Sequence, residues 1–337
     1  MKKILMIISQ LVIFSFILGA CDKDDDNKFQ DGTLNYRVKT VSGHNGLWGD
    51  YKMVYGYAGS RLDSIVWTNS QGKKNRVLEM KYNVNKIIAE LDDIVCMVSA
   101  DSAAKLDPDS IPYSRQTALR VTHTTDRNGV LLDEHIVYRA RVPQVEGGKY
   151  SYVYEQTGVV KFLYEYGEDG RLQVWRSPFY GDNSDMVKEE YVFNGQRIDK
   201  GIVTVYDVPA WTGIGDETFS YNGNLLTGWQ AFQTFPGENL LETKAEYTYS
   251  GDQVRKIVWS AKESGAWKIV REVSCSYNPG GQVTKIEYGD GEWQEIEYED
   301  LPGNFDFFLL KANSVYRIPD VLGHLRTNAF VPVTGIR

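Results

Sequence analysis

A pair of residues two positions apart, usually both aromatic, recurs along the chain at a nearly constant spacing, and this repeat limits the fold more than any other feature. In the second half of the chain the residues that lead these pairs lie 27, 28, 28 and 28 positions apart, and they are Tyr164, Tyr191, Phe219, Tyr247 and Cys275. Near the front, Tyr55 and Tyr82 repeat the unit at a spacing of 27. A fixed period of this size is typical of repeat architectures, in which each unit is one supersecondary element.

Each unit is predicted to form two strands. Side chains two positions apart share one face of a strand, so the paired aromatic residues line one side of a sheet. Pairs such as Asn222-Gly223 and Ser250-Gly251 then supply a hairpin turn, because these residues tolerate positive φ. A return strand rich in leucine and β-branched residues follows, and then a second polar loop such as residues 261–265. The pattern predicts about fourteen to eighteen antiparallel strands in meander order, without intervening helices.

Sheets of more than about ten strands usually curl, close or split. We therefore expect an all-β fold, a large antiparallel meander that forms a wide barrel or a strongly curled single sheet. Residues 34–337 are predicted to form one β-meander repeat domain. From about residue 301 the pattern stops alternating, and this part is expected to be a short helical or irregular segment that packs on the sheet or plugs one end.

Two strand registers follow from the hydrophobic pattern. An odd-length loop around Asp290-Gly291 keeps the apolar residues of the last hairpin on one face and sets Lys285 opposite Glu295 or Glu297. By simple alternation, Arg271 shares its face with the apolar residues Ile269, Val273, Cys275 and Tyr277. A lipid-facing arginine is costly near the bilayer centre, so this pattern argues against a membrane-spanning barrel.

The first 33 residues indicate export and anchoring. Lys2 and Lys3 precede an apolar run, residues 4–18, which is shorter than the ~20 residues that a spanning helix needs. Leu18-Gly19-Ala20-Cys21 resembles the lipobox of bacterial lipoproteins, which implies a signal peptide over residues 1–20 and lipid on Cys21. The lipid would connect the protein to a membrane, so that residues 21–33 form an acidic flexible tether.

The chain resembles known families in two respects. The acidic run after Cys21 resembles the export signal of Bacteroidetes-type lipoproteins, which implies an outer membrane lipoprotein exposed at the cell surface. The segment 164–172 is similar to a YD-type repeat, although Gly167 stands where that repeat has aspartate. The whole mature chain resembles Bacteroidetes lipoproteins with an uncharacterised domain described as porin-like. That family carries no established activity.

Composition excludes some functions. The formal net charge is −8, and removal of residues 1–20, which hold two lysines and no acid, takes it to −10. An acidic chain without a basic cluster is not expected to bind nucleic acid. Cys96 and Cys275 are the cysteines other than Cys21, and they are read either as a disulfide or as two buried thiols.

No cofactor, metal or catalytic residue is predicted. The four histidines lack helical metal-site spacing, although His123 and His135 could meet across a hairpin. Glu295, Glu297 and Glu299 share one strand face, which we interpret as a solvated surface rather than as a pair of glycosidase carboxylates. No P-loop, nucleophile elbow or dinucleotide fingerprint occurs.

The tryptophans divide into two groups. Trp67, Trp175, Trp229 and Trp259 occupy equivalent repeat positions, so they are expected to pack in the core. Trp48 and Trp211 lie in predicted loops that contain glycine, where an exposed indole could stack on a sugar ring or on a partner. Residues 99–116 interrupt the repeat, and long loops in compact domains are often functional.

The sequence therefore predicts a non-enzymatic surface lipoprotein that binds an extended ligand. A glycan is favoured over a partner protein because of the location and the loop tryptophans Trp48 and Trp211. The alternatives are a hydrolase that uses loop carboxylates and a structural scaffold of the envelope.

Overall fold

The computed structural model describes residues 33–34, 36–45, 49–96, 113–126, 131–146, 149–168, 171–178, 185–195, 197–207, 211–223, 225–234, 241–251, 253–289 and 291–304. Within these ranges all regular structure is strand. No helix in them is long and apolar enough to cross a bilayer.

The described residues form twenty strands, which follow one another along the chain. The first ten are β1 Thr33–Leu34, β2 Arg37–Asn45, β3 Gly49–Ala58, β4 Arg61–Asn69, β5 Lys74–Asn83, β6 Lys86–Cys96, β7 Tyr113–Thr125, β8 Leu131–Glu146, β9 Lys149–Tyr166 and β10 Leu172–Pro178. The others are β11 Asp185–Asn194, β12 Arg197–Asp207, β13 Trp211–Asn222, β14 Leu225–Thr234, β15 Leu241–Ser250, β16 Gln253–Glu263, β17 Ala266–Tyr277, β18 Val283–Tyr288, β19 Trp293–Glu299 and β20 Gly303–Asn304.

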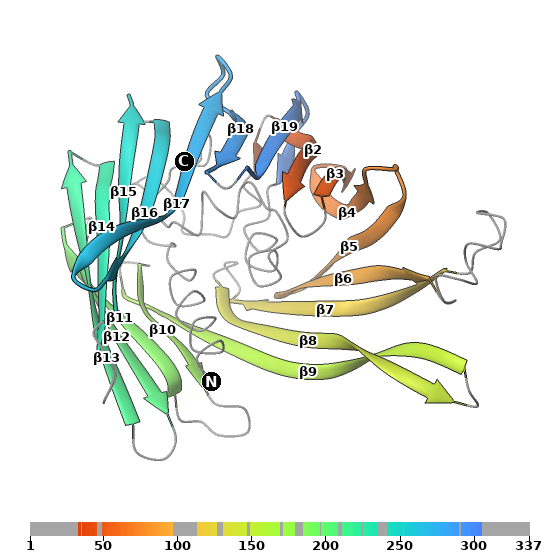
Figure 1. Ribbon diagram of the computed structural model, residues 1–337, viewed down its shortest axis with the longest axis horizontal. Coiled ribbons are helices and arrows are strands. Elements are labelled where there is room, and N and C mark those ends of the chain that lie inside the picture. The colour runs from red at the N-terminus through yellow and green to blue at the C-terminus, as the bar shows by residue number, and fades with distance from the viewer. Residues whose placement is uncertain are drawn as a thin grey trace.

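The strands β2 to β19 form a closed antiparallel barrel in meander order (Figure 1). Each strand pairs with the next one along the chain, and β19 pairs with β2 to close the ring. The short strands β1 and β20 pair only with each other, beside the start of β2. The predicted all-β barrel is confirmed. The predicted C-terminal plug lies outside the described residues beyond Asn304.

Apolar and charged side chains alternate along the strands, so the wall has one apolar face and one charged face. The apolar face is buried: Met53, Ile65 and Trp67 are each at most 1% exposed. Trp229 is also buried and Trp259 packs against the same cluster, so the predicted core role is confirmed for Trp67, Trp229 and Trp259, while the side chain of Trp175 lies outside the described part. In a closed barrel the buried apolar face is the inner one, and the charged side chains point outward.

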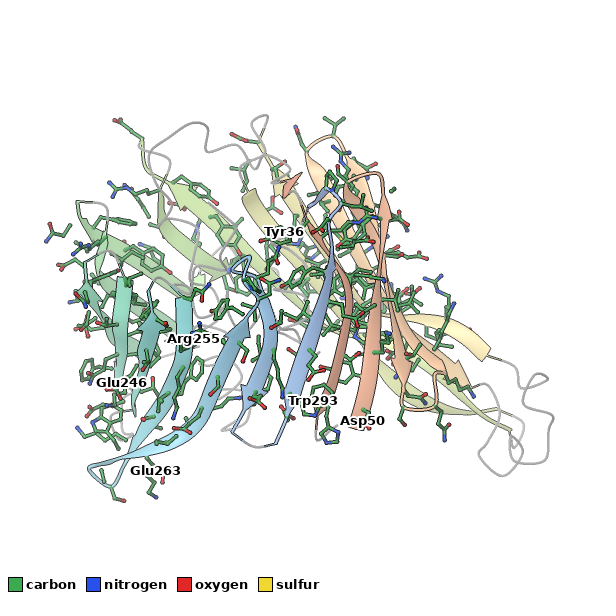
Figure 2. The ribbon with its side chains drawn as sticks, turned by 90° about the horizontal axis from the view of Figure 1, so that it is seen from above. Tyr36, Asp50, Glu246, Arg255, Glu263 and Trp293 are labelled. Carbon is green, nitrogen blue, oxygen red and sulfur yellow. The ribbon has the colours of Figure 1, made fainter. Side chains whose placement is uncertain are left out.

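The two ends of the barrel differ. Turns that follow odd-numbered strands, together with β1 and β20, lie at one end, which we call the tyrosine end. Turns that follow even-numbered strands lie at the other, the loop end. Figure 2 shows Tyr36 at the tyrosine end, and Asp50 and Glu263 at the loop end.

One tyrosine contact recurs around the tyrosine end. The second aromatic residue of a hairpin donates its hydroxyl to a backbone carbonyl of the neighbouring hairpin, as Tyr249 does to Leu226 at 2.7 Å. The acceptor is the cross-strand partner of the second aromatic residue in that neighbouring hairpin. In this example Leu226 is the cross-strand partner of Tyr221. The other five pairs are Tyr57 with Val38, Tyr82 with Leu62, Tyr221 with Ile198, Tyr277 with Val254 and Tyr298 with Val283. Tyr82 thus corresponds to Tyr57, so its predicted equivalence with Tyr55 is wrong. We call this contact the tyrosine clasp.

Arginines and bulges accompany the clasps. The guanidinium of Arg37 lies 4.4 Å from the ring centre of Tyr57, and that of Arg61 lies 5.3 Å from Tyr82, both within cation–π range. A register shift occurs just before the second aromatic residue in five hairpins: at Tyr57, Phe193, Tyr221, Tyr249 and Tyr277. Each such bulge increases the local twist of the strand pair. Repeated twist helps the sheet to close.

The two-residue turns begin one residue later than predicted, so that each glycine is the first central residue and not the second. Asn222 and Ser250 end their strands and pair with Leu225 and Gln253, so the glycine that follows each is the first central residue of the turn. Gly223 has a φ of 58°, which is strained for residues with a Cβ.

Three buried polar side chains are linked by hydrogen bonds inside the loop end. Tyr288 donates to Gln294 at 3.1 Å, and the amide of Gln294 donates to the hydroxyl of Tyr51 at 2.8 Å. Gly43 pairs with both Gln294 and Tyr51. A Cβ at Gly43 would lie 2.2 Å from the Tyr51 hydroxyl, so the glycine leaves the space that the tyrosine fills.

The last hairpin has the predicted odd-length loop, with Lys285 opposite Glu295. Two other expectations were wrong. Residues 261–265 are not a loop, because β16 continues to Glu263 and only Ser264 and Gly265 form the turn. A bulge pairs Ile269 with Ser260 but Arg271 with Trp259, so Ile269 lies on the outer face, opposite to that of Arg271.

Candidate binding surface

The predicted site residues are only partly within the described structure. Cys21 and Trp48 lie outside the described residues. Trp211 is the first residue of β13, and its backbone pairs with Asp207 of β12. This residue therefore begins a strand instead of lying within a loop. Of residues 99–116, those from Tyr113 onward belong to β7.

The three alternating glutamates form a solvated outer face, as predicted. Glu297 accepts a hydrogen bond from the Thr40 hydroxyl at 2.7 Å, and Glu299 pairs with Arg37. Glu295 lies 3.9 Å from Lys285. Each carboxylate has a partner on the same face, and nothing in this arrangement resembles an acid and base pair that faces a substrate.

The two central histidines do not meet. His123 pairs with Glu134 across β7 and β8, whereas His135 pairs with Thr122, so the two rings lie on opposite faces. His123 and Glu134 are fully buried, with Nδ1 and Oε2 3.4 Å apart. Burial, together with the charge of Glu134, holds the pKa of Tyr164 well above its usual value. Among the described residues, no cluster of three or more His, Cys, Asp or Glu could hold a metal ion.

Cys275 is a free thiol on the inner face of β17. Burial raises its pKa to about 12, so it carries little of the thiolate that nucleophilic or redox chemistry needs. Cys96 ends β6, seven strands away in the ring. The second reading, a buried free thiol, is confirmed for Cys275.

The loop end is uneven because its hairpins differ in length. The β8–β9 hairpin continues to the pair Glu146–Lys149, while β7 pairs with β8 only up to Tyr138. On the other side of the barrel, the β16–β17 hairpin reaches the pair Glu263–Ala266, while β17 pairs with β18 only from Val273 onward. Figure 1 shows this part of β17 leaving the side of β18.

The projecting part of β17 carries exposed apolar side chains. Ile269 is 62% exposed, Val270 60% and Trp267 37%, although Lys244 and Lys262 lie over the indole ring. Most large apolar residues of the wall are buried, so this cluster differs from the rest of the outer face. Sequence reasoning missed it, because Trp267-Lys268-Ile269 alternates like any other strand and only the shortness of β18 uncovers it.

Comparisons with known sequences and solved structures do not assign this chain to a family. No protein-family model matches the chain, and no curated protein is similar to it in sequence. It is similar to a solved porin-like protein from Bacteroides vulgatus, with 11% identity, a TM-score of 0.36 and coverage of 78% of this chain and 99% of that one. For a porin-like protein from Bacteroides uniformis the values are 9%, 0.36, 78% and 96%.

A third similar structure, the Tc holotoxin pore from Photorhabdus luminescens, has 10% identity, a TM-score of 0.27, and coverage of 74% of this chain and 18% of that one. Likenesses at these scores carry no argument about function. The resemblance to porin-like lipoproteins, the YD-type repeat and the lipoprotein assignment stay predictions.

Proposed function

We propose that the protein is a lipid-anchored binding barrel whose wall faces water and whose loop end contacts an extended ligand. The observation that carries this proposal is the distribution of charge on the wall. Apolar side chains point inward, and ion pairs cover the outside at mid-strand. A membrane pore of this size has the opposite arrangement, with an apolar band outside and a polar lumen.

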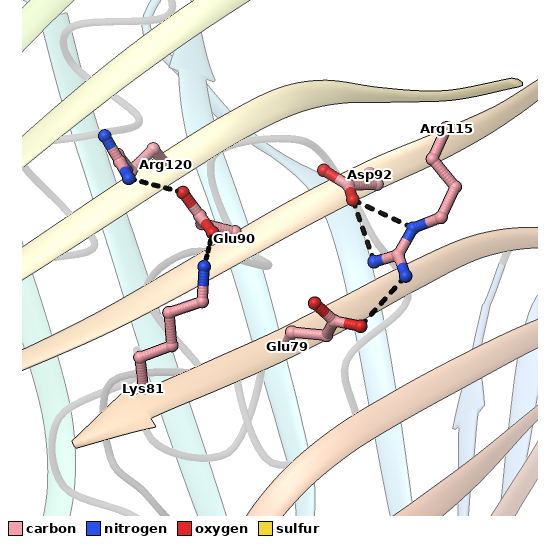
Figure 3. A network of polar contacts seen from close by, with 6 residues as sticks. All are labelled: Glu79, Lys81, Glu90, Asp92, Arg115 and Arg120. Atoms are coloured by element: carbon pink, nitrogen blue, oxygen red, sulfur yellow. Dashed lines mark hydrogen bonds and ion pairs between the residues drawn. The ribbon is translucent and has the colours of Figure 1, made fainter.

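Two neighbouring ion-pair clusters lie on the outer face of β5, β6 and β7 (Figure 3). In one, Glu90 pairs with Lys81 and Arg120, and in the other, Arg115 pairs with Glu79 and Asp92. Arg115 alone contacts two carboxylates, at 2.9 Å from Glu79 and 2.8 Å from Asp92. One cationic side chain that faces lipid near the bilayer centre costs about 2–4 kcal/mol. A surface with so many charges is stable in water but not in hydrocarbon.

The position of the N-terminal strand supports the orientation. Thr33 lies in β1, at the tyrosine end, twelve residues after Cys21. An extended chain of this length spans at most about 40 Å. A lipid on Cys21 would therefore hold the tyrosine end near the membrane and leave the loop end pointing away from it, toward ligands.

Replacement of the lipidated residue tests the proposal. A Cys21→Ala variant, expressed in a bacterial host that processes lipoproteins, should move from the membrane fraction to the soluble fraction. Palmitate incorporation should be lost in the same variant. A Cys275→Ala variant is the matched control and should stay on the membrane. Retention in salt-washed membranes of Cys21→Ala protein from which residues 1–20 have been removed, as mass spectrometry verifies, would contradict the proposal, because it would show that the barrel itself is inserted.

The preference for a glycan rests on Trp48 and Trp211 and stays a prediction. A glycan panel screened with the soluble Cys21→Ala protein would test it. Binding that is unchanged by Trp48→Ala and Trp211→Ala would exclude these residues as the sugar platform. The buried, high-pKa thiol of Cys275 and the ion-paired glutamates of β19 give no support to the alternative of a hydrolase.

A further inference from the structure

The projecting half of β17 has a strand on one side only. Gly289 donates its N–H to the carbonyl of Glu272 at 2.9 Å, and there the β18–β19 hairpin turns back. Beyond this point, residues 266–271 pair with β16, and no described strand pairs with their other edge. These six residues extend over about 20 Å. The barrel is closed, yet it keeps one open strand edge at the loop end.

The register shows which backbone groups face that edge. Ser264 and Gly265 form a two-residue turn that closes the pair Glu263–Ala266. Hydrogen-bonded and non-hydrogen-bonded pairs alternate from such a turn, so Ala266 and Lys268 direct their N–H and C=O groups toward β16. The N–H and C=O groups of Trp267 and Ile269 then point to the open edge. Their spacing of about 6.8 Å is that of a β-ladder.

The side chains add an apolar surface to this row of backbone groups. Because of the bulge, Ile269 joins Trp267 on the outer face, and Val270 stands beside them. Most natural proteins protect an exposed edge with charges, prolines or a covering loop, because it is a template for another strand. Here the residues on the edge are a tryptophan and an isoleucine, and Ile269 is mostly exposed.

We infer that this edge binds an extended segment of a partner polypeptide by strand addition. The inference rests on the proposed function only in taking the loop end as the end that meets ligands. Backbone hydrogen bonds to Trp267 and Ile269 would supply the affinity, and alternate apolar residues of the partner would pack beside the same two side chains. Main-chain donors and acceptors at a strand spacing are complementary to another main chain, which is why a peptide fits better than a glycan.

A second copy of the same chain fits this edge less well. The longest antiparallel register that avoids the β18–β19 turn is centred on Lys268, and it sets two Lys268 side chains opposite each other. Like charges directly opposite on neighbouring strands are destabilising. The edge is therefore better suited to a different polypeptide, one without a positive charge at the position opposite Lys268.

A model peptide tests the inference on the full chain carrying Cys21→Ala. The probe is a seven-residue peptide of alternating valine and threonine with a central glutamate. Hydrogen exchange should slow at the amides of Trp267 and Ile269 when the peptide binds. Methylation of the peptide amides that face β17 should abolish binding, while methylation of the intervening amides should not.

A pair of variants separates the backbone contact from the side-chain contact. Ile269→Pro removes the N–H that points to the open edge and should weaken binding by about tenfold or more. One backbone hydrogen bond is lost, and the proline ring occupies the space where the partner strand would lie. Ile269→Ala keeps the N–H and should weaken binding less. Circular dichroism verifies that both variants fold, and the methylated peptides give the same test on the unaltered edge should Ile269→Pro unfold.

Three results would overturn the inference. They are equal binding of both methylated peptides, hydrogen exchange at the amides of Trp267 and Ile269 that does not slow at saturating peptide, and a concentration-dependent dimer that Ile269→Pro abolishes. None of them depends on the lipid anchor, because the protein tested lacks Cys21. A failure here is therefore distinguishable from a failure of the fractionation experiment.

Discussion

The two ends of the barrel are built differently although the same strands connect them. At the tyrosine end the turns are short, and six tyrosine clasps join neighbouring hairpins from β11 through β19 and β2 to β6. At the loop end the hairpins end at different heights, and β17 projects past β18 with exposed apolar residues. The repeat therefore fixes one rim and leaves the other free to vary, so binding is more easily built at the loop end.

Alkaline pH should affect the tyrosine end most strongly. Burial raises the pKa of Tyr221 and Tyr249 to about 12, and it raises those of Tyr57 and Tyr298 as well. An unfolded tyrosine ionises near pH 10, so above that pH the folded state binds more protons than the unfolded state and stability falls as the pH rises. We expect cooperative unfolding between about pH 10 and pH 12.

Circular dichroism and tyrosinate absorbance, followed together, measure this effect. The two signals should change at the same pH, because these hydroxyls ionise when the barrel opens. Ionisation of the clasp tyrosines near pH 10, with an unchanged circular dichroism spectrum, would show that the clasps do not stabilise the tyrosine end of the barrel.

Truncation of a buried residue at the tyrosine end should have the next largest effect. Leu62 is 1% exposed and its carbonyl accepts the clasp of Tyr82. Leu62→Ala should lower the free energy of unfolding by about 2–5 kcal/mol, through lost burial and a cavity. Urea unfolding measures it. Ile269→Ala is the loop-end control, and its effect should stay within about 0.5 kcal/mol. Similar losses for both variants would remove the contrast between the two ends.

A smaller effect is expected for Gly43→Ala, inside the loop end. The added Cβ would lie 2.2 Å from the Tyr51 hydroxyl, so the ring must move and its hydrogen bond with Gln294 is lost. The expected cost is about 1–3 kcal/mol, as for other overpacked sites. Thermal unfolding measures it. Gly59→Ala is not a suitable control because of its positive φ, whereas Gly158→Ala is, since its Cβ would meet only Tyr138 at 3.6 Å. A neutral Gly43→Ala would mean that the loop end is loosely packed inside as well as uneven at its rim.

Loss of one clasp hydroxyl should have the smallest effect. Tyr249→Phe removes the hydrogen bond to Leu226 and should cost about 1 kcal/mol. Phe193 occupies the equivalent position in its own hairpin, so the ring itself is compatible with the site. Denaturant midpoints for the variant and the native protein give the difference. An unchanged midpoint would mean that stacking rather than the hydroxyl maintains the clasp.

Much of the fold could be predicted from the sequence, and its repeat explains why. The residues that lead the repeat, among them Tyr191 and Tyr247, all face the buried side, since side chains alternate strictly along a strand. The face of Ile269 could not be predicted, because a single bulge reverses alternation and no local residue pattern marks it. The prediction that His123 and His135 could meet across a hairpin was wrong for a similar reason. The register is offset by one residue, which puts the two rings on opposite faces.

The candidate sites were less accessible to sequence reasoning. The glycine near Trp211 suggested a loop, yet the backbone of Trp211 already belongs to β13. The backbone edge at Trp267 and Ile269 is exposed because the neighbouring strand β18, which comes later in the chain, is too short to cover it. Exposure is a property of the assembled rim and not of a motif.

The sequence by itself determined the strand period, the inward face of the aromatic residues and the meander order, because these depend on local alternation and on turns between adjacent segments. Tertiary structure alone decided the closure of the ring through β19 and β2, the bulge that turns Ile269 outward and the open edge of β17. Those features arise from twist and strand length summed over the whole sheet. No single repeat contains that information.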